Sequence, residues 1–341
     1  MKIWFDVLTP KQLLFFGPMA QKLGKNHKIL LTSRYYGQVV DLAKLKRVNL
    51  TIVGKHGGSG RKEKLKASAK RVDHLTDIVS KFSPDLVISF CSPEASRVAF
   101  GLGIKHIVFS DSPHAEAVMR LALPFAQKLL IPWIIPKEEF VKYGISKSNI
   151  IQYKAIDAAM IVKNGSNVKP IVVNSNKKTI VIRLEESSAA YALGKTSISN
   201  NIIYRFSQER EKYNVMVLTR YKHQIENLRK EFGNKVKIIK KVVDGKSLLS
   251  VTDLFIGSGG TMTAEAALMG IPTISYDAVP NHIEKYLVKS GLVKRETRPR
   301  NILQLARKML IEGPKNKDKA QRILDSMEDP FSKLMSVIKT L

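Results

Sequence analysis

The chain has 341 residues, of which 44% are hydrophobic and 25% are charged. This length and apolar content exclude a disordered or fibrous chain and predict two domains, since one domain commonly spans about 100–200 residues. Lys and Arg number 57 against 29 Asp and Glu, which gives a formal net charge of +28. Such a charge predicts an anionic partner, whether a nucleotide, a lipid headgroup or a nucleic acid.

Cys91 is the only cysteine in the sequence, which excludes an intrachain disulfide and a cysteine-based zinc cluster. The apolar run near the N-terminus is too short for a signal peptide, and no stretch reaches the roughly 18 uninterrupted apolar residues of a spanning helix. We therefore expect a cytoplasmic protein, whose contact with a membrane would be peripheral and on its inner face.

In the first half, short β-branched or aromatic runs alternate with longer segments of helical periodicity. The runs predict strands at residues 3–7, 29–32, 50–53, 86–90 and 107–110. The longer segments predict helices at 11–23, 39–46, 61–82 and 94–101. This alternation is typical of a parallel sheet that is covered by helices on both faces.

Residues 121–136 form a less regular apolar stretch that contains Pro124, Pro132 and Pro136. We interpret this stretch as buried strand and linker. The alternative is a membrane contact that includes Trp133.

The polar run 163–169 precedes a proline and has the Gly, Ser and Asn content of an interdomain hinge. We therefore expect a first domain over residues 1–165 and a second domain over 170–325. Residues 326–341 are expected to form a helix that crosses back to the first domain.

The alternation restarts after the hinge. Strands are predicted at 179–184, 215–219, 236–239, 254–256 and 273–275, and helices near 198–212, 224–232, 261–269 and 282–289. The sequence thus predicts an α/β protein with two Rossmann-like, doubly wound domains facing a central cleft. Ligands are expected at the carboxyl ends of the strands.

A glycine-rich turn, Gly257-Ser-Gly-Gly260, follows a predicted strand and leads into an alanine-rich helix. Free N–H groups and the positive end of that helix point at the turn, which makes it a candidate phosphate cradle. Glu265 lies one turn into the helix, where its carboxylate would accept hydrogen bonds from ribose hydroxyls. The alternative is a tight connection with no ligand. No Walker Lys-Ser/Thr follows, so metal-assisted ATP hydrolysis is not implied.

This segment resembles the nucleotide-sugar half-site of the GT-B glycosyltransferases. Among them it resembles in particular the enzyme that adds N-acetylglucosamine to lipid-linked muramoyl pentapeptide, and it also resembles the non-hydrolysing UDP-N-acetylglucosamine 2-epimerases. In those families the turn binds the UDP diphosphate and the helix glutamate binds the ribose. The resemblance implies that Ser258, Gly259, Gly260 and Thr261 hold phosphate and that Glu265 holds ribose.

Over nearly its whole length the chain also resembles a mainly archaeal family of unknown function, number 354, which has no firmly assigned reaction. The matching stretches include the glycine turn and Asp6 with Pro10, Thr32-Ser-Arg34, Gly54-Lys-His56-Gly57, Asp111-Ser-Pro-His114-Ala, Arg183 with Ala190-Tyr191, Thr219-Arg220-Tyr-Lys-His-Gln224, and Val243-Asp244 with Leu248-Leu249.

Candidate catalytic residues follow the predicted strand 107–110. Asp111 and His114 provide a carboxylate and an imidazole, the pair needed for general-base activation of an acceptor hydroxyl. Glu116 is a third candidate. The alternative is that Asp111 and His114 only stabilise the loop.

Residues 114–120 are similar to the His-x-Glu-Ala-Gly-x-Arg segment of the 2-epimerases, whose glutamate is catalytic. The other two catalytic positions of those enzymes depart from the pattern. Their aspartate would fall near Glu94, and their histidine near Arg183, which Leu184 and Glu185 follow. Epimerisation is therefore the alternative to glycosyl transfer.

Two arginines and an aspartate are further candidates for binding the nucleotide sugar. Arg183 and Arg220 each lie at a predicted strand end, where a guanidinium can bind phosphate oxygens, and Asp244 is grouped with them at the nucleotide-sugar site. A surface ion pair is the alternative for either arginine.

A second group is expected on the acceptor side, at the rim of the cleft. It comprises Asp6, Lys11, Arg34 and His56, the last in a basic glycine-rich loop that could close on an anionic acceptor.

Together these features predict a metal-independent glycosyltransferase that uses a nucleotide diphosphate sugar, probably UDP-linked, as donor substrate and no cofactor. Its acceptor is unknown, and a lipid-linked one on an anionic membrane surface fits the charge. The alternatives are a 2-epimerase-like enzyme and a non-catalytic nucleotide-sugar-binding protein. Nucleic acid is not the expected partner, because no aromatic residues interleave the basic runs. The sequence does not predict an oligomeric state.

Overall fold

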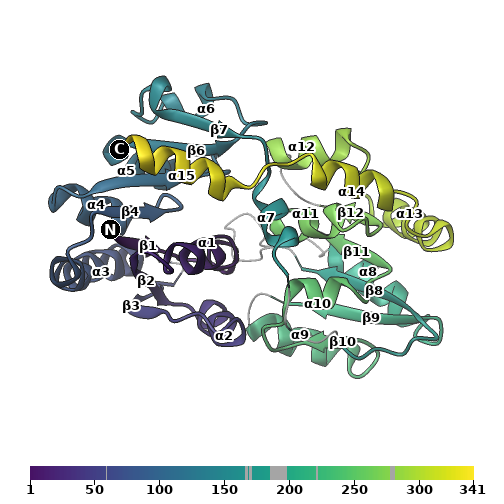
Figure 1. Ribbon diagram of the computed structural model, residues 1–341. Coiled ribbons are helices and arrows are strands. Elements are labelled where there is room, and N and C mark those ends of the chain that lie inside the picture. Colours follow the sequence, from purple (N-terminus) through teal and green to yellow (C-terminus); the bar gives the residue numbers. More distant parts are fainter. Residues whose placement is uncertain (59, 166–167, 169–170, 185–197, 220–221, 277–280) are drawn as a thin grey trace. The chain divides into compact units, whose positions relative to one another are not determined.

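The computed structural model describes residues 1–58, 60–165, 168, 171–184, 198–219, 222–276 and 281–341 (Figure 1). The chain forms two compact units. Unit 1 consists of Met1–Ile161 together with Glu328–Leu341, and unit 2 consists of Val162–Met327.

Unit 1 contains a seven-stranded sheet in the order β3-β2-β1-β4-β5-β6-β7, and all its neighbouring strands are parallel. The carboxyl ends of the strands therefore share one edge. The strands are β1 (Lys2–Asp6), β2 (Lys28–Tyr35), β3 (Thr51–Lys55), β4 (Leu86–Ser89), β5 (Lys105–Phe109), β6 (Lys128–Pro132) and β7 (Ile150–Tyr153).

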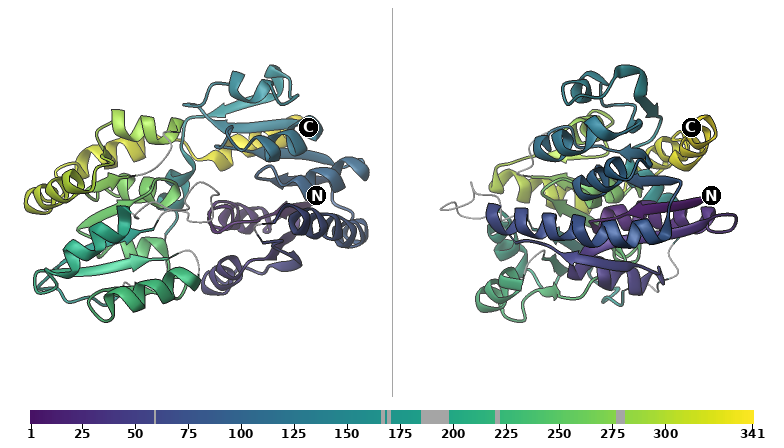
Figure 2. Two further views of the ribbon diagram at one scale, coloured as in Figure 1. Left: turned by 180° about the vertical axis from the view of Figure 1, so that it is seen from behind. Right: turned by 90° about the vertical axis from the view of Figure 1, so that its left-hand side faces the viewer.

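Helices cover both faces of this sheet (Figure 2). Successive residues of β1 point to opposite faces because the side chains of a strand alternate. Trp4 packs in a cluster with Leu75 of the helix α3, whereas Phe5 contacts Phe16 of α1 with ring centroids 5.5 Å apart. The helices of unit 1 are α1 (Pro10–Leu23), α2 (Gly37–Leu45), α3 (Arg61–Phe82), α4 (Pro93–Gly101), α5 (Glu116–Ala122), α6 (Glu138–Val141), the first part of α7 (Asp157–Lys163) and α15 (Pro330–Thr340), with 3-10 turns at Leu123–Phe125 and Lys147–Asn149.

Unit 2 contains a six-stranded parallel sheet in the order β10-β9-β8-β11-β12-β13. Its strands are β8 (Lys178–Arg183), β9 (Tyr213–Leu218), β10 (Lys237–Ile239), β11 (Leu254–Gly257), β12 (Thr273–Ser275) and β13 (Lys294–Arg295). Its helices are α8 (Ile198–Ser207), α9 (Lys222–Phe232), α10 (Gly245–Leu249), α11 (Thr261–Leu268), α12 (His282–Lys289), α13 (Pro299–Glu312) and α14 (Lys317–Asp325).

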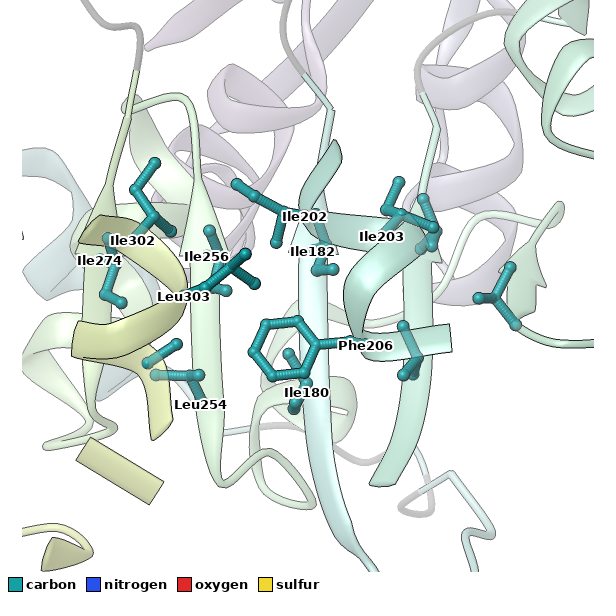
Figure 3. Close-up of a cluster of buried hydrophobic side chains, with 14 of the residues drawn as sticks. Ile180, Ile182, Ile202, Ile203, Phe206, Leu254, Ile256, Ile274, Ile302 and Leu303 are labelled. Carbon is teal, nitrogen blue, oxygen red and sulfur yellow. The ribbon is translucent and has the colours of Figure 1, made fainter. Parts of the chain in front are cut away.

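The core of unit 2 has two layers, one on each face of the sheet. Ile180 and Ile182 of β8 pack with Phe206 of α8 and with side chains of α13 (Figure 3). Val181, which lies between them in the strand, packs on the other face with Leu248 of α10. Because successive side chains of a strand point to opposite faces, this packing fixes the face of the sheet to which each residue at the carboxyl ends of β8 and β11 points.

The prediction of two Rossmann-like α/β domains is confirmed, although the strands β6, β7 and β13 and the helices α5, α6, α7, α10, α13 and α14 were not predicted individually. The predicted helix 198–212 is shorter in the structure, since α8 ends at Ser207. The apolar stretch 121–136 contains β6, whose Leu129, Leu130 and Ile131 are fully buried, so its interpretation as buried strand is confirmed. Among the described helices, none has the length and apolar character to cross a bilayer.

Candidate functional site

The carboxyl edge of the sheet in unit 2 carries a row of residues paired across four strands. The backbone register joins Arg183 of β8 to Gly257 of β11, Gly257 to Ser275 of β12, and Ser275 to Arg295 of β13. The glycine turn therefore starts between an arginine and a serine, both at strand ends. Such an edge is where ligands bind in open α/β sheets.

Glycine is needed at two positions of the turn, for two different physical reasons. A Cβ at Gly257 would lie 2.6 Å from Cε1 of Phe255 and 2.8 Å from Oγ1 of Thr263, so the position has no room for a side chain. Gly260 has φ +86° and ψ −168°, a backbone conformation that favours glycine. A Cβ at Gly260 would meet nothing within 4 Å, so this side of the turn is open.

The amino end of α11 is suited to an anion. Gly260 is its N-cap residue and provides no side-chain acceptor for the N–H groups of the first turn. Those N–H groups and the helix dipole favour negative charge beside Ser258, Gly259 and Thr261. The guanidinium of Arg183 reaches the same turn, because its Nη1 lies 4.0 Å from Sδ of Met262, the second residue of α11.

Glu265 is buried, with 6% of its surface exposed, and it lies against the start of α10. Its Oε2 is 3.1 Å from the position that a Cβ at Gly245, the first residue of α10, would occupy. The carboxylate of Asp244 caps the same helix by accepting hydrogen bonds from the Ser247 N–H at 2.8 Å and the Ser247 hydroxyl at 2.9 Å. The structure thus brings Glu265 and Asp244 together at one helix end.

Glu284 is a residue of this edge that the sequence analysis did not identify. Its Oε1 accepts a 2.5 Å hydrogen bond from the Ser275 hydroxyl and lies 3.6 Å from Nε of Arg295. Its backbone N–H donates to Asn281, the N-cap of α12. Asn281 with Glu three residues later is the sequence signature of a capping box, which could have drawn attention to Glu284.

Arg220, also predicted for the nucleotide-sugar site, lies outside the described residues.

In unit 1, Asp6 was expected on a rim but is fully buried. Its carboxylate accepts hydrogen bonds from both Nη atoms of Arg71 at 3.1 and 2.5 Å, from Ser92 at 2.6 Å and from Thr32 at 2.7 Å. Burial alone would raise the pKa of Asp6, but Arg71 and the two hydroxyls lower it below its ordinary value. Asp6 therefore holds α3 on the sheet.

Of the three basic rim candidates, Arg34 lies in β2 and His56 directly follows β3. Arg34 is half-buried, and its Nε has no hydrogen-bond partner among the described residues. His56 is exposed, and its Nδ1 accepts a 3.0 Å hydrogen bond from the Gly58 N–H. Burial and then the charges of Arg34 and Lys64 lower the pKa of His56, so its ring is neutral at pH 7.

Asp111 follows β5 at the carboxyl edge of the same sheet. Its carboxylate forms an ion pair with Lys11, the second residue of α1, and accepts a 2.9 Å hydrogen bond from Ser112. No hydrogen bond joins Asp111 to His114 in the described part of the chain; the His114 side chain is exposed. The expected Asp-His pair is thus replaced here by an Asp-Lys pair.

Lys11 also contacts Asp157, the first residue of α7, at 2.7 Å. Tyr153, the last residue of β7, donates a 2.5 Å hydrogen bond to the other oxygen of Asp157. Asp157 and Tyr153 were not predicted for this site, because they lie more than 40 positions after Asp111 in the chain. A predicted β7 would have placed them at this edge.

Burial raises the pKa of Asp157 to about 6, and the charge of Asp111 acts in the same direction against the attraction of Lys11. Burial would also raise the pKa of Asp111, but its ion pair with Lys11 lowers it. Both carboxylates are thus ionised at pH 7, and one of them titrates close to neutrality.

Glu116 is exposed and belongs to a local ion pair. Its Oε1 accepts a 2.8 Å hydrogen bond from Nε of Arg120, four residues later in α5. Glu116 and Arg120, which both belong to the epimerase-like segment 114–120, thus contact each other on the surface of α5. The described residues contain no group of three or more His, Cys, Asp or Glu side chains arranged to hold a metal ion.

Sequence comparison matches residues 1–340 to the family described as "Protein of unknown function (DUF354)". An uncharacterized protein of Methanocaldococcus jannaschii is 32% identical over 305 residues, which cover 84% of this chain and 85% of that protein.

Solved structures with the same fold include two UDP-GlcNAc 2-epimerases and a glycosyltransferase. The Neisseria meningitidis epimerase, solved bound to UDP-GlcNAc, has a TM-score of 0.73 at 16% identity over the whole of both chains. The Methanocaldococcus jannaschii epimerase has a TM-score of 0.65 at 16% identity, covering 95% of this chain and 99% of its own. The spinosyn forosaminyltransferase has a TM-score of 0.64 at 14% identity, covering 100% and 99%. At these identities the similarity shows the two-domain GT-B fold.

Proposed function

Because this chain belongs to the DUF354 family and has the fold of the GT-B glycosyltransferases and epimerases, we propose that it is a glycosyltransferase. Its donor substrate is a nucleotide diphosphate sugar, UDP-linked, bound by unit 2. Its acceptor is bound by unit 1. The reaction needs no cofactor beyond the donor.

The observation that carries this proposal is the glycine turn at the carboxyl edge of unit 2. An open glycine at the uncapped amino end of α11 and an arginine in register with the start of the turn form a site for a diphosphate. The buried carboxylate of Glu265, one helical turn further on, supports recognition of ribose hydroxyls.

The chemistry follows from these charges. When the bond between the sugar carbon and the diphosphate oxygen breaks, its electron pair stays on the leaving diphosphate. The N–H groups of α11 and the guanidinium of Arg183 stabilise that developing negative charge. The attacking oxygen comes from an acceptor hydroxyl, whose proton is taken by Asp111, with His114 on the same loop as the second candidate.

The acceptor is anionic or lies on an anionic surface. The net charge of +28 supports this part of the proposal, because basic surfaces attract anionic headgroups by about 1 kcal/mol per nearby Lys or Arg. A lipid-linked acceptor combines both properties.

The donor site is tested by calorimetric titration with UDP, UDP-N-acetylglucosamine, ADP and GDP. We expect selective binding of the uridine nucleotides, which Glu265→Ala weakens by about 1–3 kcal/mol because ribose hydroxyls lose their partner. Gly260→Asp should abolish binding, since it places a carboxylate where the diphosphate lies. Gly313→Asp is the matched control, because Gly313 has φ +67°, ψ −164° and equally open surroundings at the end of α13.

Binding of none of the nucleotides would overturn the donor assignment. Equal loss in Gly260→Asp and Gly313→Asp would attribute the effect to backbone strain and remove the phosphate role of the turn. Incubation with UDP-N-acetylglucosamine then separates the activities: release of UDP with an acceptor supports transfer, conversion to the 2-epimer supports an epimerase, and binding without either product supports a non-catalytic protein.

A further inference from the structure

A cluster of two carboxylates around one ammonium lies at the carboxyl edge of the sheet in unit 1. Lys11 forms an ion pair with Oδ2 of Asp111 and lies 2.7 Å from Oδ2 of Asp157. The side chains of Lys11, Asp111 and Asp157 are 19%, 16% and 2% exposed. The three residues come from α1, from the loop after β5 and from α7, so the fold of unit 1 holds them together.

The charges of this cluster do not cancel. Two ionised carboxylates and one ammonium leave one negative charge in surroundings that exclude most water. Tyr153 of β7 donates a hydrogen bond to Asp157, and burial together with the Asp111 charge raises the pKa of the Cys91 thiol, but neither group carries a compensating positive charge at pH 7. Like charges that share a buried site favour uptake of one proton by the pair.

The two carboxylates differ in access. Asp111 is the more exposed of the two, and its Oδ1 accepts a hydrogen bond from the Ser112 hydroxyl. Asp157 has one oxygen on Lys11 and the other on Tyr153, so its position is fixed on both sides. A proton that reaches Asp111 from a bound molecule can therefore be shared with Asp157, because both carboxylates contact the same Lys11 ammonium.

We propose that Asp111 and Asp157 share one exchangeable proton and form the proton-accepting site of unit 1. Asp111 receives the proton from the bound molecule, and Asp157 is the carboxylate that retains it. The chemical role rests on the proposed function. The O–H bond of the acceptor hydroxyl breaks, its electron pair forms the new bond to the sugar carbon, and the proton passes to the carboxylate pair while the diphosphate leaves with its own bonding electrons.

The pair is a better proton acceptor at neutral pH than an isolated aspartate. A general base works best when its pKa lies near the working pH. Burial and the Asp111 charge raise the pKa of Asp157 to about 6, whereas an ordinary aspartate titrates near 4. Lys11 keeps Asp111 ionised at neutral pH, since the charge of Lys11 lowers the pKa of that carboxyl.

The experiment is an NMR titration of the free protein labelled with ¹³C at the aspartate carboxyls. In the wild type we expect one aspartate signal with a midpoint near pH 6. Asp157→Asn should remove that midpoint, and Asp111→Asn should lower it by removing the like charge. Lys11→Met and Tyr153→Phe should raise it, because each removes a group that stabilises the ionised carboxylate.

Asp41→Asn, in an exposed position of α2, is the control and should leave the midpoint unchanged. The proposal is overturned if no aspartate has a midpoint above pH 5, or if the midpoint near 6 persists in Asp157→Asn. If Lys11→Met does not fold, Tyr153→Phe tests the same expected rise of the midpoint without removing a charge. A shared proton found in a protein that binds no nucleotide would refute the proposed function and leave the proton site standing.

Discussion

Arg71 is a charged residue in the interior of unit 1, with 1% of its surface exposed. Its guanidinium binds the Asp6 carboxylate with two hydrogen bonds, donates to the Val53 carbonyl at 3.0 Å and lies 3.6 Å from Glu94. The sequence suggests none of this, because position 71 reads as one more cation in a lysine-rich helix. A buried ion pair contributes little net stability, but breaking it leaves a buried charge without a partner.

We therefore expect Arg71→Met to lower the free energy of unfolding of unit 1 by about 3–5 kcal/mol. The double variant Asp6→Asn, Arg71→Met should recover much of that loss, because no buried charge remains. Urea unfolding followed by tryptophan fluorescence measures the effect, since Trp4 and Trp133 are the two tryptophans of the chain and both belong to unit 1.

Arg120→Met is the control for this experiment. It removes an exposed ion pair on α5 with partners more than 60% exposed, which should change stability little. If Arg71→Met lowers the free energy of unfolding no more than the control does, the buried Asp6 carboxyl does not need Arg71 for stability.

At the scale of elements, α15 belongs to unit 1 although it follows the whole of unit 2 in the chain. Leu334 and Val337 are buried, one helical turn apart, and the carbonyl oxygen of Leu341 accepts a hydrogen bond from Lys105 at the start of β5. The link between Glu328 and Lys154 is reciprocal: each backbone N–H donates to the other residue, to the Lys154 carbonyl at 3.0 Å and to the Glu328 side chain at 2.6 Å.

Leu334→Ala should therefore destabilise unit 1 by about 2–5 kcal/mol through the lost apolar burial and the cavity left behind. Tryptophan fluorescence in urea reports this change, because both tryptophans lie in unit 1. Lys339→Ala, at an exposed position of the same helix, should leave the midpoint unchanged. An unaltered fluorescence transition in Leu334→Ala would contradict the packing of α15 on unit 1.

The strands β1, β8 and β11 were predictable because they contain continuous runs of β-branched, aromatic and other large apolar side chains, which are buried on both faces of a parallel sheet. By contrast, β6 ends at Pro132 in a stretch that Pro124 and Pro136 also interrupt, and β7 follows irregular turns, so neither stood out as a strand between two helical segments. The order of the sheet, in which β7 is the seventh strand at one edge, is set by tertiary packing.

The candidate site shows the same division. The glycine turn was predictable, because strand, small residues and helix follow one another within the chain. The Lys11, Asp111 and Asp157 cluster was not, because its members are brought together only by the strand order. The Asp111-His114 pair was inferred from proximity in sequence, which does not determine where two side chains in a turn point.

At the scale of the whole molecule, the excess of positive charge opposes compaction. A formal net charge of +28 on 341 residues produces repulsion that dissolved ions screen, with a Debye length that falls from about 10 Å at 0.1 M salt to about 3 Å at 1 M. Several surface ion pairs, such as Arg120–Glu116, Lys142–Glu139 and Lys147–Glu138, are local and exposed, so screening them removes less stability than screening the repulsion restores.

We expect the thermal unfolding midpoint to rise by a few degrees when KCl is increased from 0.05 to 0.5 M, both concentrations being chosen conditions for a scanning-calorimetry series. The direction follows from the net charge alone. A matched series in potassium glutamate separates screening from chloride binding. A midpoint that falls with salt would mean that attractive pairs outweigh the net repulsion.

The division of the chain between the units also determines the order of its synthesis. Unit 2 is continuous, from Val162 to Met327, whereas unit 1 lacks its last segment until Glu328–Leu341 has been made. At a translation rate of about 5–20 residues per second, roughly 10–40 s separate the synthesis of residue 161 from that of residue 341. During that interval the nascent first unit exposes the surface that α15 later covers. The unit that begins first on the ribosome is therefore the one that is completed last.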